Sequence, residues 1–424
     1  MSAGHTGGGK PPGLHALIIG VGAYPWLRRG ERYVEGAHPR ADDFAQLSSP
    51  PHSAYALAHW LSTVQSTEAA APLGSLELLV SAAPGFEHGY ESLTVKARQA
   101  TFGEIRDAFS RWRDRCNENE ENIALFYFCG HGYAAGQQEH VLLPEDFGED
   151  PDAFYDNGID LATTMQAVAE FRASTQIFLI DACREELDNS FRGRRGRGLG
   201  HPRNPGFDPA PDLAIFHSAQ YGRRAFGRPG AATTFTQSLI QALDGLGAVL
   251  DDRWGIDLVS LSAAVAKLVP WNTLLGADGA DALAREQKSS QYVSGLGRPL
   301  RLFDAAPQVP FRIRVQPTDA MASAELHLTP HDPDLPVVSR PKPSYEMWKG
   351  TATAGSYKMS AAFSEHEDWN KEVSSIFMPP CVDRTIDVTP SQDAQDAQDA
   401  QTSQTSQTSQ TSQNAQDTLD RSAS

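Results

Sequence analysis

The feature of this 424-residue chain that most constrains its fold is a series of short, almost wholly apolar runs separated by amphipathic segments. Apolar runs of strand length, without polar alternation, are typical of parallel strands that helices cover on both faces. The expected strands lie at 14–21, 75–82, 121–128, 175–181, 213–219 and 298–303, and the expected helices at 51–64, 101–112, 158–171, 235–243 and 258–269. This alternation predicts an α/β fold with a mostly parallel sheet flanked by helices, which the last strand closes.

Composition divides the chain into further parts. The Gly-rich residues 1–13 predict a disordered leader before the α/β domain at 14–305, and the Gln-, Thr- and Ser-rich residues 391–424 predict a disordered tail. Within the α/β domain, the Gly-, Arg- and Pro-rich stretch 187–212 predicts a long basic loop that adds nothing to the core. Period-two alternation between Pro and Gly turns predicts a small β-sandwich-like domain at 308–390, called the β-domain below.

Charge and composition narrow the classes of partner. The formal net charge of −17 argues against binding to nucleic acids or anionic membranes. No apolar stretch approaches the roughly 20 residues that span a bilayer, and residues 1–13 lack the apolar core of a secretory signal. The four cysteines form no CxxC pair, which suits a reducing compartment better than a disulfide framework. These features predict a cytoplasmic protein without nucleic-acid or membrane partners.

Two of the expected strands end in reactive residues. The strand at 121–128 is followed by His131 and the strand at 175–181 by Cys183, 52 positions further along the chain. This separation allows one crossover between neighbouring parallel strands, whose carboxyl ends meet at the same edge of a sheet. A thiolate can attack a carbonyl while an imidazole protonates the leaving amine. The sequence therefore predicts a Cys–His nucleophilic site.

Glycines and backbone amides complete this predicted site. Gly130 and Gly132 flank His131 and are expected to let the chain turn sharply there. The backbone N–H groups of Gly132 and Cys183 are the candidates for holding a tetrahedral oxyanion.

Five segments of the chain carry a family resemblance. They are HALIIGVGAY, LFYFCGHGY, HVLLPEDFG, TQIFLIDACRE and TTFTQSLIQAL, in this order. Over roughly 14–303 the chain resembles the bacterial caspase-like and metacaspase branch of the caspase-fold cysteine peptidases, in which a histidine upstream of the cysteine at about this interval is a known feature. The resemblance implies a cysteine endopeptidase with His131 and Cys183 as its catalytic pair. It also implies protein substrates and a bacterial defence, stress or cell-death pathway, and allows for a zymogen.

The same resemblance bears on specificity. It places Asp181 in the pocket for the residue before the scissile bond (P1), where a carboxylate suits Arg or Lys. The alternative is that Asp181 only caps a loop. The second acid that the family often supplies is replaced by Ser53. Ser218 and Gln220 lie in a segment that resembles the one along which a substrate strand pairs.

Neither a metal nor another cofactor is predicted. Metacaspases often need calcium, and the resemblance leaves that dependence open. The acidic residues near the third strand, however, lack the EF-hand order of oxygen ligands around a central glycine, so a solvated loop is expected. They are Glu145, Asp146, Glu149, Asp150 and Asp152.

The basic loop offers a second use of an Arg-directed activity. Candidate autoprocessing sites are Arg192, Arg194, Arg195 and Arg197, just downstream of Cys183. A linker that is never cut is the alternative.

Two other functional classes compete with a peptidase. A nucleotide-binding enzyme is excluded because Gly20-Val21-Gly22 lacks the third glycine of the dinucleotide fingerprint, and because Lys10 is not followed by Ser or Thr as in a phosphate-binding loop. A catalytically inactive caspase-like signalling or assembly module, acting through the β-domain, stays open. In either reading, the β-domain is expected to bind an activating or regulatory protein.

Overall fold

The computed structural model describes residues 10–65, 71–136, 139–184, 191, 193–203, 211–220, 229–275, 287–364 and 367–388. The chain divides into two compact units, one ending at Pro307 and one beginning at Gln308. Each unit is described by itself.

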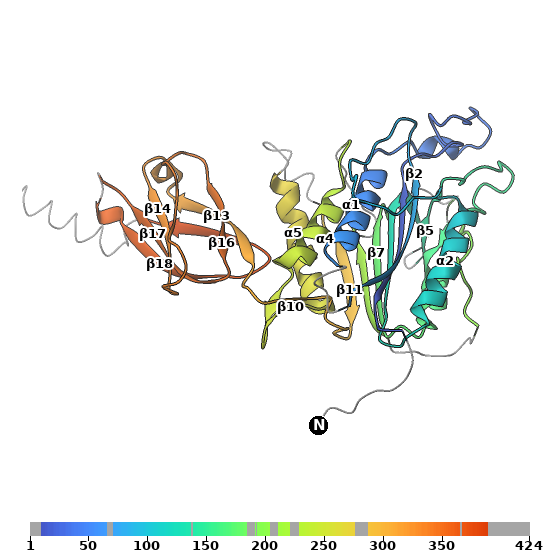
Figure 1. The fold of residues 1–424 in the computed structure, drawn as a ribbon. Helices are drawn as coiled ribbons and strands as arrows, with labels where there is room; N and C mark the ends of the chain where they lie inside the picture. The colour runs from blue at the N-terminus through green and yellow to red at the C-terminus, as the bar shows by residue number, and fades with distance from the viewer. Residues whose placement is uncertain are drawn as a thin grey trace, which may run out of the picture. The chain divides into compact units, whose positions relative to one another are not determined.

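The first unit is built on a six-stranded sheet with the order β11-β8-β7-β3-β1-β2 (Figure 1). Its strands are β1 Leu14–Val21, β2 Leu73–Ser81, β3 Ile123–Gly130, β7 Thr175–Ala182, β8 Asp212–His217 and β11 Ser290–Ser294. The first five are parallel, and β11 alone runs antiparallel, next to β8. Every residue of β1, β3 and β7 is buried, as expected for strands covered on both faces. The predicted α/β class and mostly parallel sheet are confirmed.

The predicted last strand of the sheet was wrong. Residues 298–303 contain β12 (Arg301–Phe303), which pairs with β10 (Trp254–Ile256) in a separate three-stranded sheet with β9 (Val249–Leu250). The edge of the central sheet is β11 instead. Its side chains are half-buried or exposed, so its sequence SQYVS carries no apolar run that would reveal a strand.

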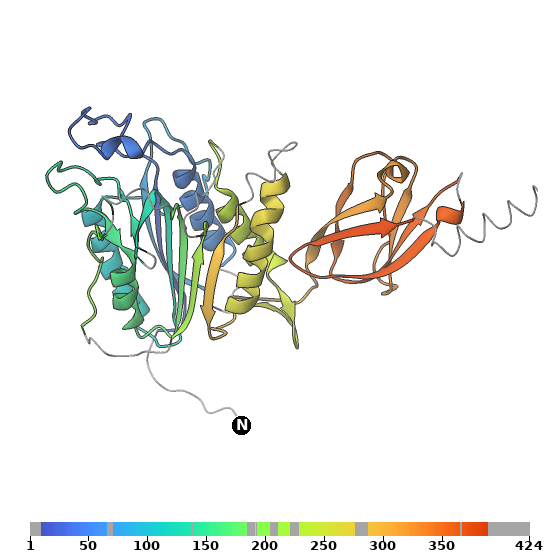
Figure 2. The ribbon, with the colours of Figure 1, turned by 180° about the vertical axis from the view of Figure 1, so that it is seen from behind.

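Helices cover both faces of the central sheet (Figures 1 and 2). They are α1 Ser49–Thr63, α2 Phe102–Cys116, α3 Leu161–Ala169, α4 Thr234–Gln241 and α5 Leu258–Leu275, with a π-helix at Ala242–Leu246 and a 3-10 turn at Ala41–Asp43. Leu61 of α1, Leu239 of α4 and Leu261 of α5 meet side chains of one sheet face, and α2 and α3 pack on the other. Thr101 caps α2 by accepting a hydrogen bond from the Glu104 N–H, at the expected capping position.

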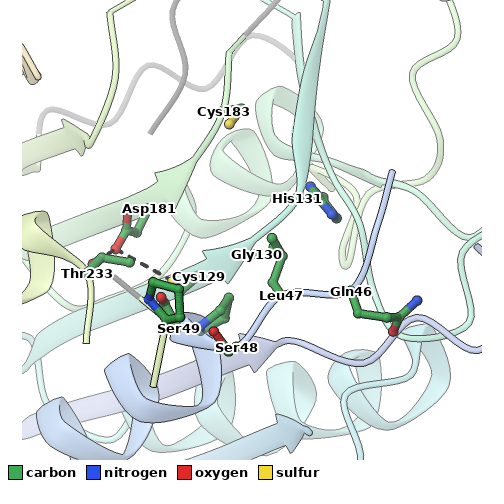
Figure 3. Close-up of a pocket in the computed structure, with 12 residues that line it drawn as sticks. Gln46, Leu47, Ser48, Ser49, Cys129, Gly130, His131, Asp181, Cys183 and Thr233 are labelled. Atoms are coloured by element: carbon green, nitrogen blue, oxygen red, sulfur yellow. Dashed lines mark hydrogen bonds between the residues drawn. The ribbon is translucent and has the colours of Figure 1, made fainter. Parts of the chain in front are cut away.

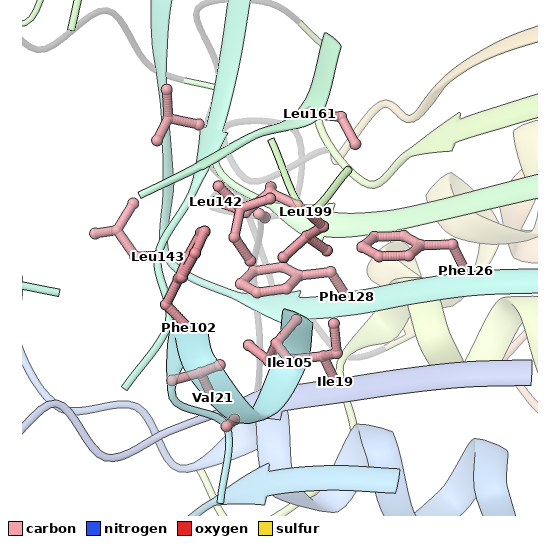
Figure 4. Close-up of a cluster of buried hydrophobic side chains, with 14 of the residues drawn as sticks. Ile19, Val21, Phe102, Ile105, Phe126, Phe128, Leu142, Leu143, Leu161 and Leu199 are labelled. Carbon is pink, nitrogen blue, oxygen red and sulfur yellow. The ribbon is translucent and has the colours of Figure 1, made fainter. Parts of the chain in front are cut away.

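One hydrophobic core lies between the sheet and α2 and α3 (Figure 4). Alternate residues of the strands point into it, among them Ile19, Phe126 and Phe128. Two of its members, Phe191 and Leu199, come from the basic segment. The expectation that this segment adds nothing to the core was therefore wrong, because two isolated apolar residues in a Gly/Arg-rich stretch give no periodic signal.

A small antiparallel sheet extends the first unit beyond β3. Its strands are β4 Gly132–Gly136, β5 Glu139–Leu142 and β6 Ile159–Asp160, in the order β4-β5-β6. Because β4 begins two residues after β3 ends, this sheet lies beside the carboxyl end of the central sheet.

The second unit consists of two small sheets. Their orders are β16-β13-β19 and β15-β14-β17-β18, with β13 Gln308–Gln316, β14 Glu325–Pro330, β15 Val338–Ser339, β16 Trp348–Thr353, β17 Gly355–Ala362, β18 Lys371–Phe377 and β19 Val382–Asp387. Two 3-10 turns lie at Thr318–Ala322 and Glu367–Trp369. Phe377 of the second sheet contacts Phe311 of the first with ring centroids 5.7 Å apart. The sheets thus share one core, as in a β-sandwich.

No helix in the described part of either unit is long and apolar enough to cross a membrane.

Candidate active site

A cavity of about 310 Å³ lies at the carboxyl ends of β3 and β7 (Figure 3). It is lined by Gln46, Leu47, Ser48, Ser49, Pro50, Cys129, Gly130, His131, Asp181, Cys183, Pro229 and Thr233. The register pairs Gly130 of β3 with Ala182 of β7, so His131 and Cys183 are the next residues along each strand. The structure thus brings both residues of the predicted pair, and Asp181, to one cavity.

His131 is held in one orientation by the segment after β1. Its Nε2 lies 2.7 Å from the Ala45 carbonyl oxygen, and since a carbonyl only accepts, Nε2 carries the proton. Its backbone N–H donates to the Tyr24 hydroxyl at 2.8 Å, and the rings of Tyr24 and Phe44 flank the imidazole. Burial lowers the pKa of His131 to about 4, so the ring is neutral at pH 7. Nδ1 is then the nitrogen able to accept a proton.

The glycines around His131 are explained by space and not by backbone conformation. Neither Gly130 nor Gly132 has a positive φ, so neither position needs glycine for its backbone conformation. A Cβ on Gly130 would lie 2.8 Å from the Tyr24 hydroxyl, the same group that holds the His131 N–H. Each glycine therefore makes room for a neighbouring polar group.

Asp181 is almost completely buried, with 2% of its surface exposed. Its Oδ2 accepts hydrogen bonds from the hydroxyls of Thr233 and Thr236, the latter at 3.0 Å, and from the Cys129 thiol at 3.6 Å. Its Oδ1 is buried and makes no hydrogen bond of good geometry in the described structure, but the Ser218 hydroxyl lies close enough to act on the Asp181 carboxyl. Burial raises the pKa of Asp181, while these hydroxyl and thiol donors act in the opposite direction.

Among the described residues, the hydrogen-bond partners of the Asp181 carboxylate are thus side chains and not the backbone of a loop. Asp181 itself lines the cavity. Its Oδ2 accepts hydrogen bonds from Thr233 and Thr236, while its Oδ1 makes no hydrogen bond of good geometry in the described structure. The fully buried Ser53, at the position of the missing second acid, accepts a hydrogen bond from the Thr233 N–H at 3.0 Å.

Sequence reasoning did not identify the hydrogen-bond partners of Asp181 and His131. Thr233 is the N-cap of α4 and Thr236 lies in its first turn, so a capping motif was visible, but nothing linked it to an aspartate 52 positions away. The Ala45 carbonyl has no sequence signature, because any residue supplies a carbonyl group.

Ser218 and Gln220 do not line the cavity. The Ser218 N–H donates to the Ile180 carbonyl at 2.9 Å, and its own carbonyl accepts from the Gln287 side chain at 2.7 Å. The exposed Gln220 uses its N–H on the Lys288 carbonyl at 3.1 Å. These bonds occupy three backbone groups of the segment. Pairing of a substrate along this segment stays a prediction.

The basic segment is held to the unit at several points. Arg192 lies outside the described residues. The Arg194 guanidinium lies 5.3 Å from the Tyr155 ring, and Arg195 forms an ion pair with Glu139.

Arg197 is held more tightly. Its guanidinium donates to the Asp156 carbonyl at 2.7 Å and the Asn157 side chain at 2.6 Å, and it lies 4.2 Å from the Phe102 ring. Cleavage after Arg194, Arg195 or Arg197 requires this segment to leave its place, and autoprocessing stays a prediction.

The acidic residues near the third strand divide into two groups. Glu149, Asp150 and Asp152 are exposed. Asp146 instead accepts the Phe102 N–H at 2.8 Å at the start of α2, and Glu145 accepts from Ser81. Among the residues that the structure describes, no three His, Cys, Asp or Glu side chains are grouped so that they could hold a metal ion.

Comparison with known proteins identifies the family. The caspase-domain model of peptidase family C14 matches residues 14–298. An uncharacterized protein, y4kE, from Sinorhizobium fredii (strain NBRC 101917 / NGR234) is 26% identical over 257 residues, which cover 59% of this chain and 72% of that protein. The crystal structure of caspase-1 from Spodoptera frugiperda is similar with a TM-score of 0.39 and 13% identity, covering 69% of this chain and 88% of that one. With its family model matching more than half of its length, the chain belongs to the caspase-domain family of cysteine peptidases, C14.

Proposed function

We propose that this protein is a cysteine endopeptidase that uses Cys183 as its nucleophile and His131 as its general base and acid. The observation that carries the proposal is the shared cavity at the ends of β3 and β7, with the His131 ring oriented by the Ala45 carbonyl so that Nδ1 is free to accept a proton. Membership of the C14 family agrees with it.

The reaction follows the chemistry of these groups. His131 Nδ1 takes the thiol proton as Cys183 Sγ forms a bond to the scissile carbonyl carbon, and the carbonyl electrons move to oxygen. The backbone N–H groups of Gly132 and Cys183 stabilise that oxyanion. When the C–N bond breaks, the His131 imidazolium protonates the leaving amine, and a thioester remains. Water, deprotonated by His131, then attacks the thioester and releases the carboxylic acid and the thiol.

A cationic P1 side chain fits the free oxygen of Asp181. A buried carboxylate with one oxygen unpaired is costly in an empty cavity, and an Arg or Lys side chain would satisfy both its charge and its hydrogen bonding. We therefore propose protein substrates that are cut after Arg or Lys.

The biological setting is proposed from the family resemblance and, for location, from the composition of the chain. We propose a cytoplasmic enzyme in a bacterial defence, stress or cell-death pathway, made as a zymogen and regulated by a protein that binds the β-domain.

The deciding experiment compares four fluorogenic peptides that differ only in P1 (Arg, Lys, Asp or Leu). Wild type is assayed beside Cys183→Ala, with Cys116→Ala as the matched control because Cys116 is buried in the core, away from the cavity. Cleavage after Arg or Lys that is lost only in Cys183→Ala supports both parts of the proposal. Cleavage after Asp or Leu alone would keep the Cys–His mechanism and refute the role of Asp181.

Absence of cleavage is read with a second probe. If a thiol-directed peptidyl electrophile also fails to label Cys183, the inactive caspase-like module becomes the better account. Labelling without turnover would indicate an enzyme that awaits activation.

A further inference from the structure

A second histidine contacts the backbone of the candidate nucleophile. His140 lies on β5 with 3% of its surface exposed, and its Nε2 is 2.9 Å from the Cys183 carbonyl oxygen. Because a carbonyl only accepts, Nε2–H is the donor. Burial, with Arg184 as a second cause, lowers the pKa of His140 to about 3, so the ring is neutral at physiological pH. Cys183 thus receives a fixed, uncharged donor.

This hydrogen bond acts where the sheet no longer holds the chain. The β3–β7 ladder ends at the pair Gly130–Ala182, one residue before Cys183. His140 belongs to the neighbouring sheet, in which β5 pairs with β4 (Gly132–Gly136). It therefore links β5, the partner of the strand β4 that starts just after His131, to the residue that follows β7.

Gly132 leaves the space that this contact needs. A Cβ at Gly132 would lie 2.7 Å from His140 Nε2 and 3.1 Å from the Cys183 carbonyl oxygen. Both distances are shorter than ordinary carbon contacts, so a side chain here would force the imidazole or the Cys183 peptide to move. His140, Gly132 and Cys183 are thus in mutual contact, and two of them supply the proposed oxyanion donors.

We infer that His140 is a positioning residue, whose Nε2–H holds the Cys183 carbonyl and thereby fixes the Cys183 backbone that carries the thiol and the oxyanion-binding N–H. This inference rests on the proposed peptidase function and adds a residue to it. His140 touches no reacting atom. Its effect arises because displacement of catalytic groups by about 1 Å can cost about 100-fold in rate.

The test uses two substitutions at His140 and one control. His140→Leu removes the donor, whereas His140→Gln places an amide N–H close to the position of Nε2. His217→Leu is the matched control, because its half-buried ring lies 5.5 Å from that of His140 and its Nδ1 has no hydrogen-bond partner in the described structure. Thermal melting of each full-length variant shows whether it folds.

In peptide hydrolysis, His140→Leu is expected to lower kcat by about 10- to 100-fold and to leave KM unchanged. His140→Gln should recover most of kcat, and His217→Leu should retain it. A wild-type kcat in His140→Leu would overturn the inference. So would an equal loss in all three variants, which would show a packing effect.

Amide hydrogen exchange at 182–184 separates this inference from the proposed function. Exchange there should be faster in His140→Leu than in wild type, and close to wild type in His140→Gln and His217→Leu. If wild type cleaves no peptide but exchange changes in this way, the peptidase proposal fails while the positioning contact stands. Unchanged exchange in His140→Leu would refute the inference whether or not the protein is active.

Discussion

Asp181→Asn tests whether this buried acid is kept for binding or for stability. In the structure, Asp181 Oδ2 is held by three donors, and Oδ1 is buried without a partner. If the acid served stability alone, its loss should weaken the fold. If it is kept for a substrate cation, the empty site carries the cost of a buried, half-satisfied charge, and the neutral amide should relieve that cost.

The sign of the pH effect follows from the raised pKa. Burial raises the pKa of Asp181 above its value in the unfolded chain, which is about 3.9, so the folded state holds the proton more tightly. Its contribution to the free energy of unfolding becomes less favourable as pH rises from about 4 through the raised folded-state pKa. The cost is absent in acid below about pH 4 and grows as the carboxyl ionises at higher pH.

The magnitude can be bounded from the contacts. Leaving one buried polar group unpaired costs about 1–3 kcal/mol. The amide can keep its oxygen toward Thr233 and Thr236, and the buried Ser218 hydroxyl, which lies beside the Asp181 carboxyl, can accept from its NH₂ group. We therefore expect Asp181→Asn to raise the free energy of unfolding by about 1–3 kcal/mol at pH 7.5, with no gain below about pH 4.

Two assays on the same samples decide the matter. Urea unfolding is measured for wild type and Asp181→Asn at both pH values, and hydrolysis of the four P1 peptides is measured at pH 7.5. Greater stability with loss of Arg and Lys cleavage indicates a carboxylate retained for substrate. A variant that is less stable at pH 7.5, or a gain that does not depend on pH, would refute the reasoning.

Three further predictions concern the surroundings of the site. Gly130→Ala should lower kcat by about tenfold or more, because its Cβ would displace the Tyr24 hydroxyl that holds His131. The control is Gly103→Ala in α2, where nothing lies within 4 Å, and it should keep full activity and raise the free energy of unfolding in urea by up to about 1 kcal/mol. Equal activities of the two variants would contradict the prediction. In a pH–rate profile, kcat/KM should fall on the acid side only as pH approaches about 4, where His131 becomes protonated and can no longer accept the thiol proton; an acid limb near the ordinary histidine value of about 6.5 would count against it. Arg197→Ala should make the basic segment more sensitive to limited digestion by trypsin, because it removes two hydrogen bonds and a ring contact, and an unchanged digestion rate would show that this side chain does not hold the segment.

The sequence was sufficient for the five parallel strands of the central sheet and for bringing His131 and Cys183 to one cavity. Strands buried on both faces show their burial directly as apolar runs, and parallel strands bring their ends together without further information. The edge strand β11 was not predicted, because it pairs with only one neighbouring strand and its side chains are partly exposed to solvent. The burial of Phe191 and Leu199 was not predicted, because each enters the core alone from an irregular segment.

The hydrogen-bond partners around the site could not be predicted for a different reason. The donors to Asp181, the Ala45 carbonyl and the His140 contact are tertiary interactions between residues 43 to 86 positions apart. Hydrophobic periodicity carries no information on such pairs. Spacing could identify which residues react but not which groups hold them in place.

This division between reactive and supporting groups has a consequence for how the site can change. His131 and Cys183 are placed by the strands of the central sheet, so their positions are tied to the core of the unit. Asp181 is oriented by Thr233 and Thr236 at the start of α4, a separate element, and its Oδ1 is not bonded to those donors.

Substitutions at the start of α4 can therefore alter the proposed P1 preference while the Cys–His pair keeps its place. Changes at Gly130, Gly132 or His140 instead act on the reactive groups themselves. Selectivity and rate should accordingly separate in a mutational scan, with α4 variants changing the ratio of Arg to Leu cleavage and β4–β5 variants changing kcat for every peptide alike.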